Sequence, residues 1–167
     1  DRAWRKAPEM SATASAPVDY AQAARRHLRD AETLYRAGGH ANAGQLFGFA
    51  AECGLKAMLV ACNVPVGADG GLPPAHPTQS KGRHPLREHV PVLLDRITQH
   101  GQLIPDGVAA TRYLATMPRL DNFKDWSIDH RYWREGALPL DSVAGWRLAA
   151  GEVGAMLDAV EQDGVLR

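Results

Sequence analysis

The stretch His40–Cys62 reads HANAGQLFGFAAECGLKAMLVAC, and it decides the fold. It contains no proline, and its apolar residues recur in steps of three and four, the spacing that places side chains on one face of a helix. Glycines at positions 44, 48 and 54 each cost a helix up to about 1 kcal/mol relative to alanine. We therefore predict a central, mostly buried helix that depends on tertiary packing and whose small residues let neighbouring elements come close.

One acidic residue interrupts this apolar helix. Glu52 stands four residues before Lys56, and such a pair contributes only a few tenths of a kcal/mol at a surface. Two interpretations remain open: an exposed pair on the polar side of the helix, or a partly buried Glu52 that requires a cationic partner. In the second interpretation, Arg131 enters from a later aromatic segment and forms a structural ion pair with Glu52.

Further helices are predicted around the central one. Asp19 is a suitable N-cap, and Gly38-Gly39 ends the first helix, so the first two helices should be antiparallel neighbours. No stretch alternates convincingly with period two, the pattern expected of strands. The sequence therefore predicts an all-α, up-and-down bundle of four to five helices with long irregular loops after the second and fourth. Besides the central helix, the expected ranges are Tyr20–Ala37, Pro85–His100, Pro105–Thr116 and Leu140–Gln162.

Length and charge indicate one soluble globular domain. The chain has 167 residues and a formal net charge of zero, which argues against strong nucleic-acid affinity from bulk charge alone. No apolar run approaches the roughly 18 residues needed to cross a bilayer, so we expect no membrane association. Cys53 and Cys62 lie too far apart on one helix for a disulfide, and there is no signal-like apolar segment. These features favour the cytoplasm.

The ends and the longest loop are expected to be irregular. We interpret residues 1–17 as a disordered tail or an upstream remnant, because Met10 is a plausible native start and residues 1–9 would then not be native. Residues 18–163 form the single helical domain. The segment 63–84 is rich in proline and glycine, and loops of this length are often functional or disordered. We expect disorder there.

The most unusual composition lies between Asn122 and Arg134. Aromatic residues alternate there with basic ones, and two interpretations compete. In one, Trp126, Ile128 and Tyr132 fold back as a lid on the bundle, and Arg131 enters the bundle to neutralise Glu52. In the other, exposed aromatic rings stack on bases while arginines hold phosphates. Both can hold together if Trp126 and Arg131 lie inside while His130, Trp133 and Arg134 stay outside. The candidate RNA- or partner-binding residues are Lys124, Tyr132, Trp133 and Arg134.

The order of motifs resembles the HEPN superfamily of helical domains. The helix pattern AETLYRAGGH is followed by AAECGLKAML, then by HPLREHVPVLL and by an aromatic stretch containing RY. The resemblance covers about Asp19 to Val160. It implies a helical bundle that often dimerises, either as a metal-independent endoribonuclease of toxin–antitoxin or phage-defence systems or as an inactive RNA- or partner-binding module.

Active members of that superfamily carry an Arg-x(4–6)-His motif late in the bundle. Histidine transfers protons at neutral pH, and arginine stabilises charge on phosphate. Here the spacing occurs only at Arg83…His89, before the third helix, whereas His130 trails Arg119 by eleven positions. The usual late pair is therefore missing.

We accordingly predict a cytoplasmic HEPN-type module that binds RNA or a partner protein, forms a homodimer and lacks the usual nuclease pair. The alternative is an active metal-independent endoribonuclease, of the toxin kind, that uses His130 with Arg119, Arg131 or Arg134. A second alternative is a purely structural interaction subunit. The sequence contains neither a Cys-x-x-Cys nor an HExxH motif, so we expect no metal and no cofactor.

Overall fold

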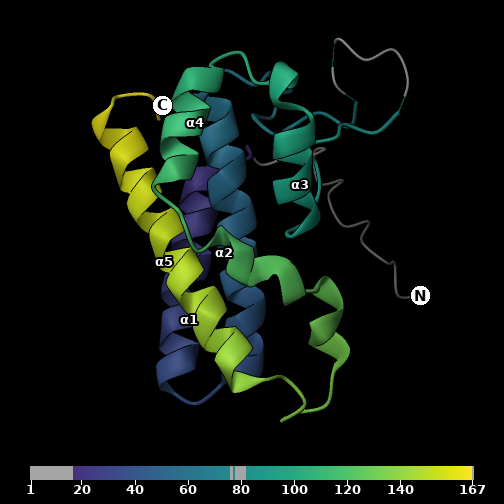
Figure 1. The fold of residues 1–167 in the computed structure, drawn as a ribbon, viewed down its shortest axis with the longest axis vertical. Coiled ribbons are helices and arrows are strands. Elements are labelled where there is room, and N and C mark those ends of the chain that lie inside the picture. Colours follow the sequence, from purple (N-terminus) through teal and green to yellow (C-terminus); the bar gives the residue numbers. More distant parts are fainter. Residues whose placement is uncertain (1–16, 76, 78–81, 167) are drawn as a thin grey trace, which may run out of the picture.

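The computed structural model describes residues 17–75, 77 and 82–166 (Figure 1). This part of the chain is all-helical and contains no strand, which confirms the predicted fold class. The predicted tail lies outside the described residues apart from position 17. The helices are α1 (Tyr20–Arg36), α2 (His40–Ala61), α3 (Val92–Gln99), η1 (Gly101–Leu103), α4 (Gly107–Ala115), η2 (Leu120–Asp125), η3 (Ile128–Tyr132) and α5 (Leu140–Gln162), where η denotes a 3-10 helix.

Helices α1 and α2 form the antiparallel pair expected from their short link. The Asp19 carboxylate accepts a hydrogen bond from the Gln22 backbone amide at 2.8 Å and so caps the first turn of α1. Gly38 then adopts a φ of +85°, a left-handed conformation that favours glycine and reverses the chain. The first and last residues of both helices lie within one position of the predicted ones.

Helix α2 lies at the centre of the bundle, and its glycines are sites of close contact. A Cβ atom at Gly48 would overlap the indole of Trp126, and one at Gly54 would overlap Val153 of α5. At Gly44, an added Cβ would lie 2.9 Å from Cζ3 of Trp146. The prediction that these small residues admit close neighbours is therefore confirmed.

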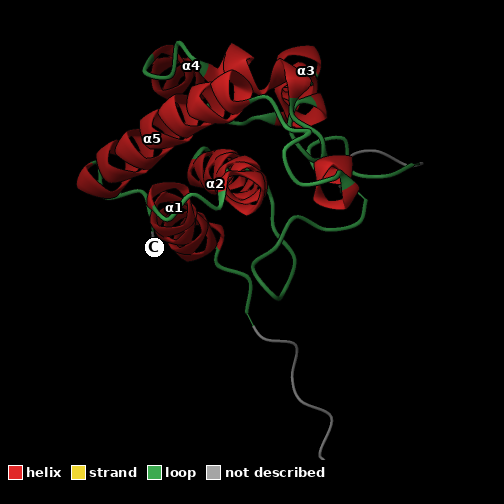
Figure 2. Cartoon of the chain, turned by 90° about the horizontal axis from the view of Figure 1, so that it is seen from below, coloured by secondary structure: helices red, strands yellow, loops and turns green. Residues whose placement is uncertain are grey.

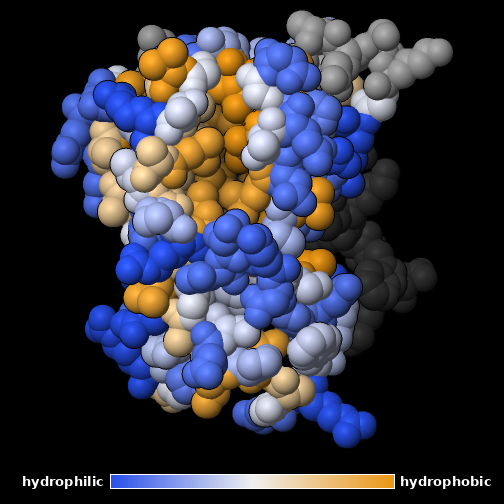
Figure 3. All heavy atoms as spheres, in the orientation of Figure 1, coloured by the Kyte–Doolittle hydropathy of each residue, from blue (hydrophilic) through white to orange (hydrophobic). Residues whose placement is uncertain are grey.

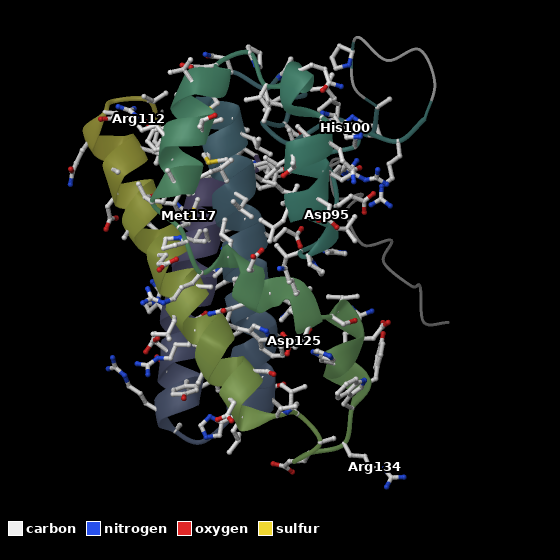
Figure 4. All side chains as sticks on the ribbon, in the orientation of Figure 1. Asp95, His100, Arg112, Met117, Asp125 and Arg134 are labelled. Atoms are coloured by element: carbon white, nitrogen blue, oxygen red, sulfur yellow. The ribbon has the colours of Figure 1, made fainter. Side chains whose placement is uncertain are left out.

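Helix α5 has the predicted bounds and packs lengthwise on α2. Its buried residues follow the heptad-like spacing seen in the sequence, among them Val143, Trp146 and Val153. Beyond its end, Asp163 accepts hydrogen bonds from Tyr113 Oη at 2.6 Å and from Arg112 at 2.7 Å. These bonds attach α4 to the end of α5, and Figure 4 shows Arg112 at this junction.

The third helix is much shorter than predicted. Its apolar stripe is buried as expected, but only Val92–Gln99 is helical, whereas Pro85–His100 was predicted. Pro91 is the N-cap residue, and a proline disfavours helical backbone in the residue before it. The chain from His84 to Val90 consequently forms turns. Helix α4 is also shorter than predicted, because Asp106 caps it at the Ala109 amide.

The long loop after α2 is irregular but attached to the bundle. The Val18 amide donates to the Asp69 carbonyl at 2.7 Å, and the Leu72 amide donates to Tyr20 Oη at 2.9 Å. The His84 amide donates to the Pro74 carbonyl at 2.8 Å. The expectation of disorder is therefore wrong for the described part of this loop; positions 76 and 78–81 lie outside it.

Two segments flank the same side of α2. Figure 1 places α3 and the 3-10 helix η3 on the side of α2 away from α5, whereas η2 packs against α5, where Asn122 Nδ2 donates to the Gly145 carbonyl at 3.0 Å. Figure 3 shows apolar side chains in the recess between α4 and α3, while the surface below, around η2 and η3, is mostly hydrophilic. Among the described residues, no helix combines the length and apolar content needed to cross a membrane.

The glycine contacts lead to a stability test. Gly48→Ala places a methyl group inside the Trp126 ring and should lower the free energy of unfolding by about 1–3 kcal/mol, the usual cost of overpacking. Gly151→Ala is the matched control, since nothing lies within 4 Å of its added Cβ, and it should stabilise by up to about 1 kcal/mol. Urea denaturation measures both. Equal effects of the two substitutions would contradict the packing described.

Candidate functional site

The aromatic segment Asn122–Arg134 is attached to the first half of α2. The indole of Trp126 lies on Gly48, and its Nε1 donates to the Gly44 carbonyl at 2.9 Å. Gln45 Nε2 donates to the Ser127 carbonyl at 3.0 Å. Trp126 is buried, as the lid interpretation predicted. The residues that follow are thus held at a fixed place on the bundle.

His130 is buried, although it was expected outside. Its ring lies 4.3 Å from the Trp133 ring and 5.5 Å from the Trp146 ring, between centroids. Its Nδ1 accepts from the Ser127 backbone amide at 3.4 Å, as part of a capping box at the start of η3. Burial lowers the pKa of His130, against the opposing influence of Asp125 and Asp129. This environment suits a neutral, structural imidazole.

The residues just after His130 are exposed. Tyr132 is 73% exposed, and the guanidinium carbon of Arg131 lies 4.6 Å from the centre of its ring. Trp133 is 51% exposed, and Arg134 extends away from the bundle (Figure 4). Two aromatic and two basic side chains, consecutive in the sequence, are therefore exposed to solvent. Stacking and phosphate binding both require such accessible groups.

The remaining predicted residues are held in surface ion pairs. Lys124 Nζ lies 3.0 Å from Asp121 Oδ2, and both side chains are exposed. Arg119 binds Glu152 of α5 through its guanidinium and through its backbone amide, the latter at 2.9 Å. The three candidate catalytic residues therefore contact different groups: Arg119 binds Glu152, His130 packs between two indoles, and Arg131 lies over Tyr132. These contacts do not join them into one site.

Glu52 is buried, but its partners differ from the predicted one. Its carboxylate oxygens lie 2.6 Å from Lys56 Nζ and 2.6 Å from His89 Nδ1. Arg131, the predicted partner, lies over Tyr132 instead. The reason is position along α2: the aromatic segment is bound at Gln45, seven residues before Glu52, which corresponds to about 10 Å along a helix.

Two further ionisable groups, the Cys53 thiol and the His27 imidazole, are influenced by Glu52. Burial raises the pKa of the Cys53 thiol to about 11, with a smaller contribution from Glu52, so this cysteine stays protonated. Burial and the nearby Arg26 lower the pKa of His27, while Asp30 and Glu52 oppose that shift. The side chain of His89 is 54% exposed. His89 is therefore an accessible histidine fixed by a buried carboxylate.

Sequence reasoning did not pair His89 with Glu52. The only signal in the sequence was the Arg83…His89 spacing, which is the one match to the nuclease motif. This motif lies before the third helix, and nothing in the sequence indicated that His89 would contact α2. The contact spans 37 positions of the chain and depends on how the segment His84–Val90 turns. In the part of the chain that the structure describes, no group of three or more His, Cys, Asp or Glu residues is arranged to hold a metal ion.

Comparison with protein-family models, with curated proteins and with solved structures gave no match for this chain. Functional inference therefore rests on the residues and contacts described above.

The buried pair leads to a second stability test. Glu52→Ala leaves the Lys56 ammonium buried without its carboxylate and should cost about 3–5 kcal/mol of unfolding free energy. Asp121→Ala removes the exposed partner of Lys124 and should cost less than about 1 kcal/mol. Chemical denaturation compares them. The double variant Glu52→Leu/Lys56→Met should recover most of the loss, since no charge remains buried; a similar small cost for both single variants would contradict this account.

Proposed function

We propose that this protein is an RNA-binding helical module of HEPN type whose nucleic-acid surface is the exposed part of the aromatic segment. The observation that carries the proposal is the joint exposure of Tyr132 and Trp133 beside Arg131 and Arg134. Aromatic rings on a surface stack on bases at about 1–3 kcal/mol per base, and guanidinium groups bind phosphate. The resemblance in helix pattern supports the family; nothing in the proposal requires catalysis.

The rigidity of the segment supports this function over a purely structural role. Buried Trp126 and His130 hold the segment, so the exposed rings lose little conformational freedom when a ligand stacks on them. A purely structural lid would have no need to leave two large aromatic side chains largely in solvent. A protein partner would use the same rings, and binding measurements distinguish the two.

RNA binding is tested by removing the two arginines. Arg131→Ala/Arg134→Ala should weaken binding of a fluorescently labelled RNA by about tenfold and lower the salt dependence of log K by about two, one for each lost phosphate contact. Fluorescence anisotropy over a range of salt concentrations measures both quantities.

The matched control is Arg29→Ala/Arg36→Ala, which removes the same charge from exposed positions of α1. It should leave RNA affinity within about twofold of the wild type at moderate salt, where distant exposed charges are screened. Equal losses in the two double variants, or no RNA binding by the wild type, would reject the proposed surface.

A second candidate function, endoribonuclease activity, is favoured by the contact between Glu52 and His89. If Nδ1–H donates to the carboxylate, the outer nitrogen Nε2 is left to accept a proton. In the proposed reaction, the 2′-hydroxyl of RNA gives its proton to His89 Nε2 and its oxygen bonds to phosphorus. The P–O5′ bond then breaks, the leaving oxygen takes a proton from water, and the hydroxide that remains takes the proton from His89 Nε2, which restores the base. His130 has no step in this scheme, because it is buried.

Cleavage is tested with three histidine variants. His89→Ala should reduce the rate of RNA cleavage by about a hundredfold or more, the usual contribution of a general base, and Glu52→Gln should reduce it as well. His100→Ala, at the other end of α3, is the control and should cleave normally. Gel analysis should show 2′,3′-cyclic phosphate ends. Loss of cleavage in a folded His130→Ala variant would support His130 instead, and an inactive wild type would remove this candidate.

The resemblance also leads us to propose a homodimer that acts in a toxin–antitoxin or phage-defence setting in the cytoplasm. Domains of the superfamily often dimerise, and a homodimer supports neither candidate function over the other.

A further inference from the structure

Three rings connect the exposed surface of the aromatic segment to the core. Trp133 contacts His130 edge to face at 4.3 Å, and His130 stacks on Trp146 at 5.5 Å with an interplanar angle of 21°. Trp146 is fully buried, and its Nε1 donates to Asp125 Oδ1 at 2.8 Å. The exposed indole of Trp133 therefore contacts a buried imidazole, which in turn stacks on a fully buried, hydrogen-bonded indole.

The neighbouring ring is covered differently. The guanidinium of Arg131 covers one face of Tyr132, and the 73% exposure of this residue leaves the other face to solvent. The backbone between the two rings is fixed as well, since the Trp133 amide donates to the His130 carbonyl at 3.0 Å. Consecutive aromatic side chains thus stand on a backbone with a defined conformation, which lowers the entropic cost of stacking.

Charge near these rings is balanced. Between positions 121 and 135 the sequence has four acidic residues and three lysines or arginines, and the whole chain has no net charge. Binding driven by phosphate charge alone, which does not distinguish single from double strands, is consequently weak here. Stacking has to supply much of the affinity, and a base can stack on protein only when it is not already stacked and paired within a duplex.

We propose that this surface selects single-stranded RNA, with one unpaired base stacked on Trp133 and an adjacent base on Tyr132, and that His130 is the positioning residue that holds the Trp133 indole. The inference rests on the proposed RNA binding and adds the class of RNA. His130 acts through Trp133 and does not touch the ligand.

The strand preference is tested with a labelled oligouridylate and with an RNA duplex of the same length. The single strand should bind at least about tenfold more tightly, because one stacked base contributes 1–3 kcal/mol and 1.4 kcal/mol corresponds to a factor of ten. Trp133→Ala should remove that preference, whereas Trp133→Phe, which keeps an aromatic ring, should retain most of it. Leu148→Ala, which truncates an exposed side chain of α5, is the control and should change neither affinity.

The role of His130 requires a separate readout. His130→Ala should lower the affinity for the single strand several-fold and leave the affinity for the duplex unchanged. His130→Phe should keep the single-strand affinity of the wild type, because phenylalanine replaces the supporting ring. In the wild type, ultraviolet cross-linking followed by peptide mapping should place the oligouridylate on the peptide that contains Tyr132 and Trp133; this measurement does not depend on how any variant folds.

The outcomes separate the two proposals. Equal affinities for single strand and duplex, or a cross-link elsewhere, would overturn the strand selection while leaving RNA binding intact. Absence of binding to both RNAs would overturn RNA binding itself. A His130→Ala variant with unchanged single-strand affinity would overturn the positioning role alone.

Discussion

The contact between Trp126 and Gly48 is the constraint on which the rest of this structure depends. The indole occupies the volume that a side chain at position 48 would fill, and its N–H donates to the Gly44 carbonyl, one helical turn earlier. Because the ring lies on the backbone of α2 itself, the chain that follows starts from a fixed point. Ser127, His130 and the exposed Trp133 take their places from this contact.

The buried carboxylate of Glu52 is a second constraint, located further along the same helix. An isolated charge there would be strongly unfavourable, and two partners offset its desolvation: Lys56 from the next turn and His89 from the segment before α3. The bond to His89 attaches that segment to α2 and leaves half of the imidazole in solvent. Both candidate sites therefore belong to one side of α2, and each joins a buried anchor to an exposed group (Figures 1 and 2).

Local signals in the sequence predicted much of the fold. The limits of α1, α2 and α5 were predicted within one residue, because caps, glycines and the spacing of apolar residues act over a few positions. The third helix shows where this reasoning fails. Leu86, Val90, Leu93 and Ile97 repeat with helical spacing and are all buried, yet only the last two belong to a helix. The spacing of apolar residues correctly predicted which side chains are buried, whereas Pro91 determined where the helical backbone begins.

By itself, the sequence determined an all-α fold around a glycine-containing central helix, and it singled out the acid in that helix and the aromatic segment as the features whose roles had to be decided. Only the tertiary structure decided which side chains bind the Glu52 carboxylate and which rings face solvent. Arg131 and His89 were both compatible with the sequence, and the choice depended on where each segment meets α2 along its length. Likewise, His130 turned inward and Trp133 outward because the 3-10 turn after Ser127 sets their directions. Such choices depend on contacts between residues far apart in the chain, and no local pattern encodes them.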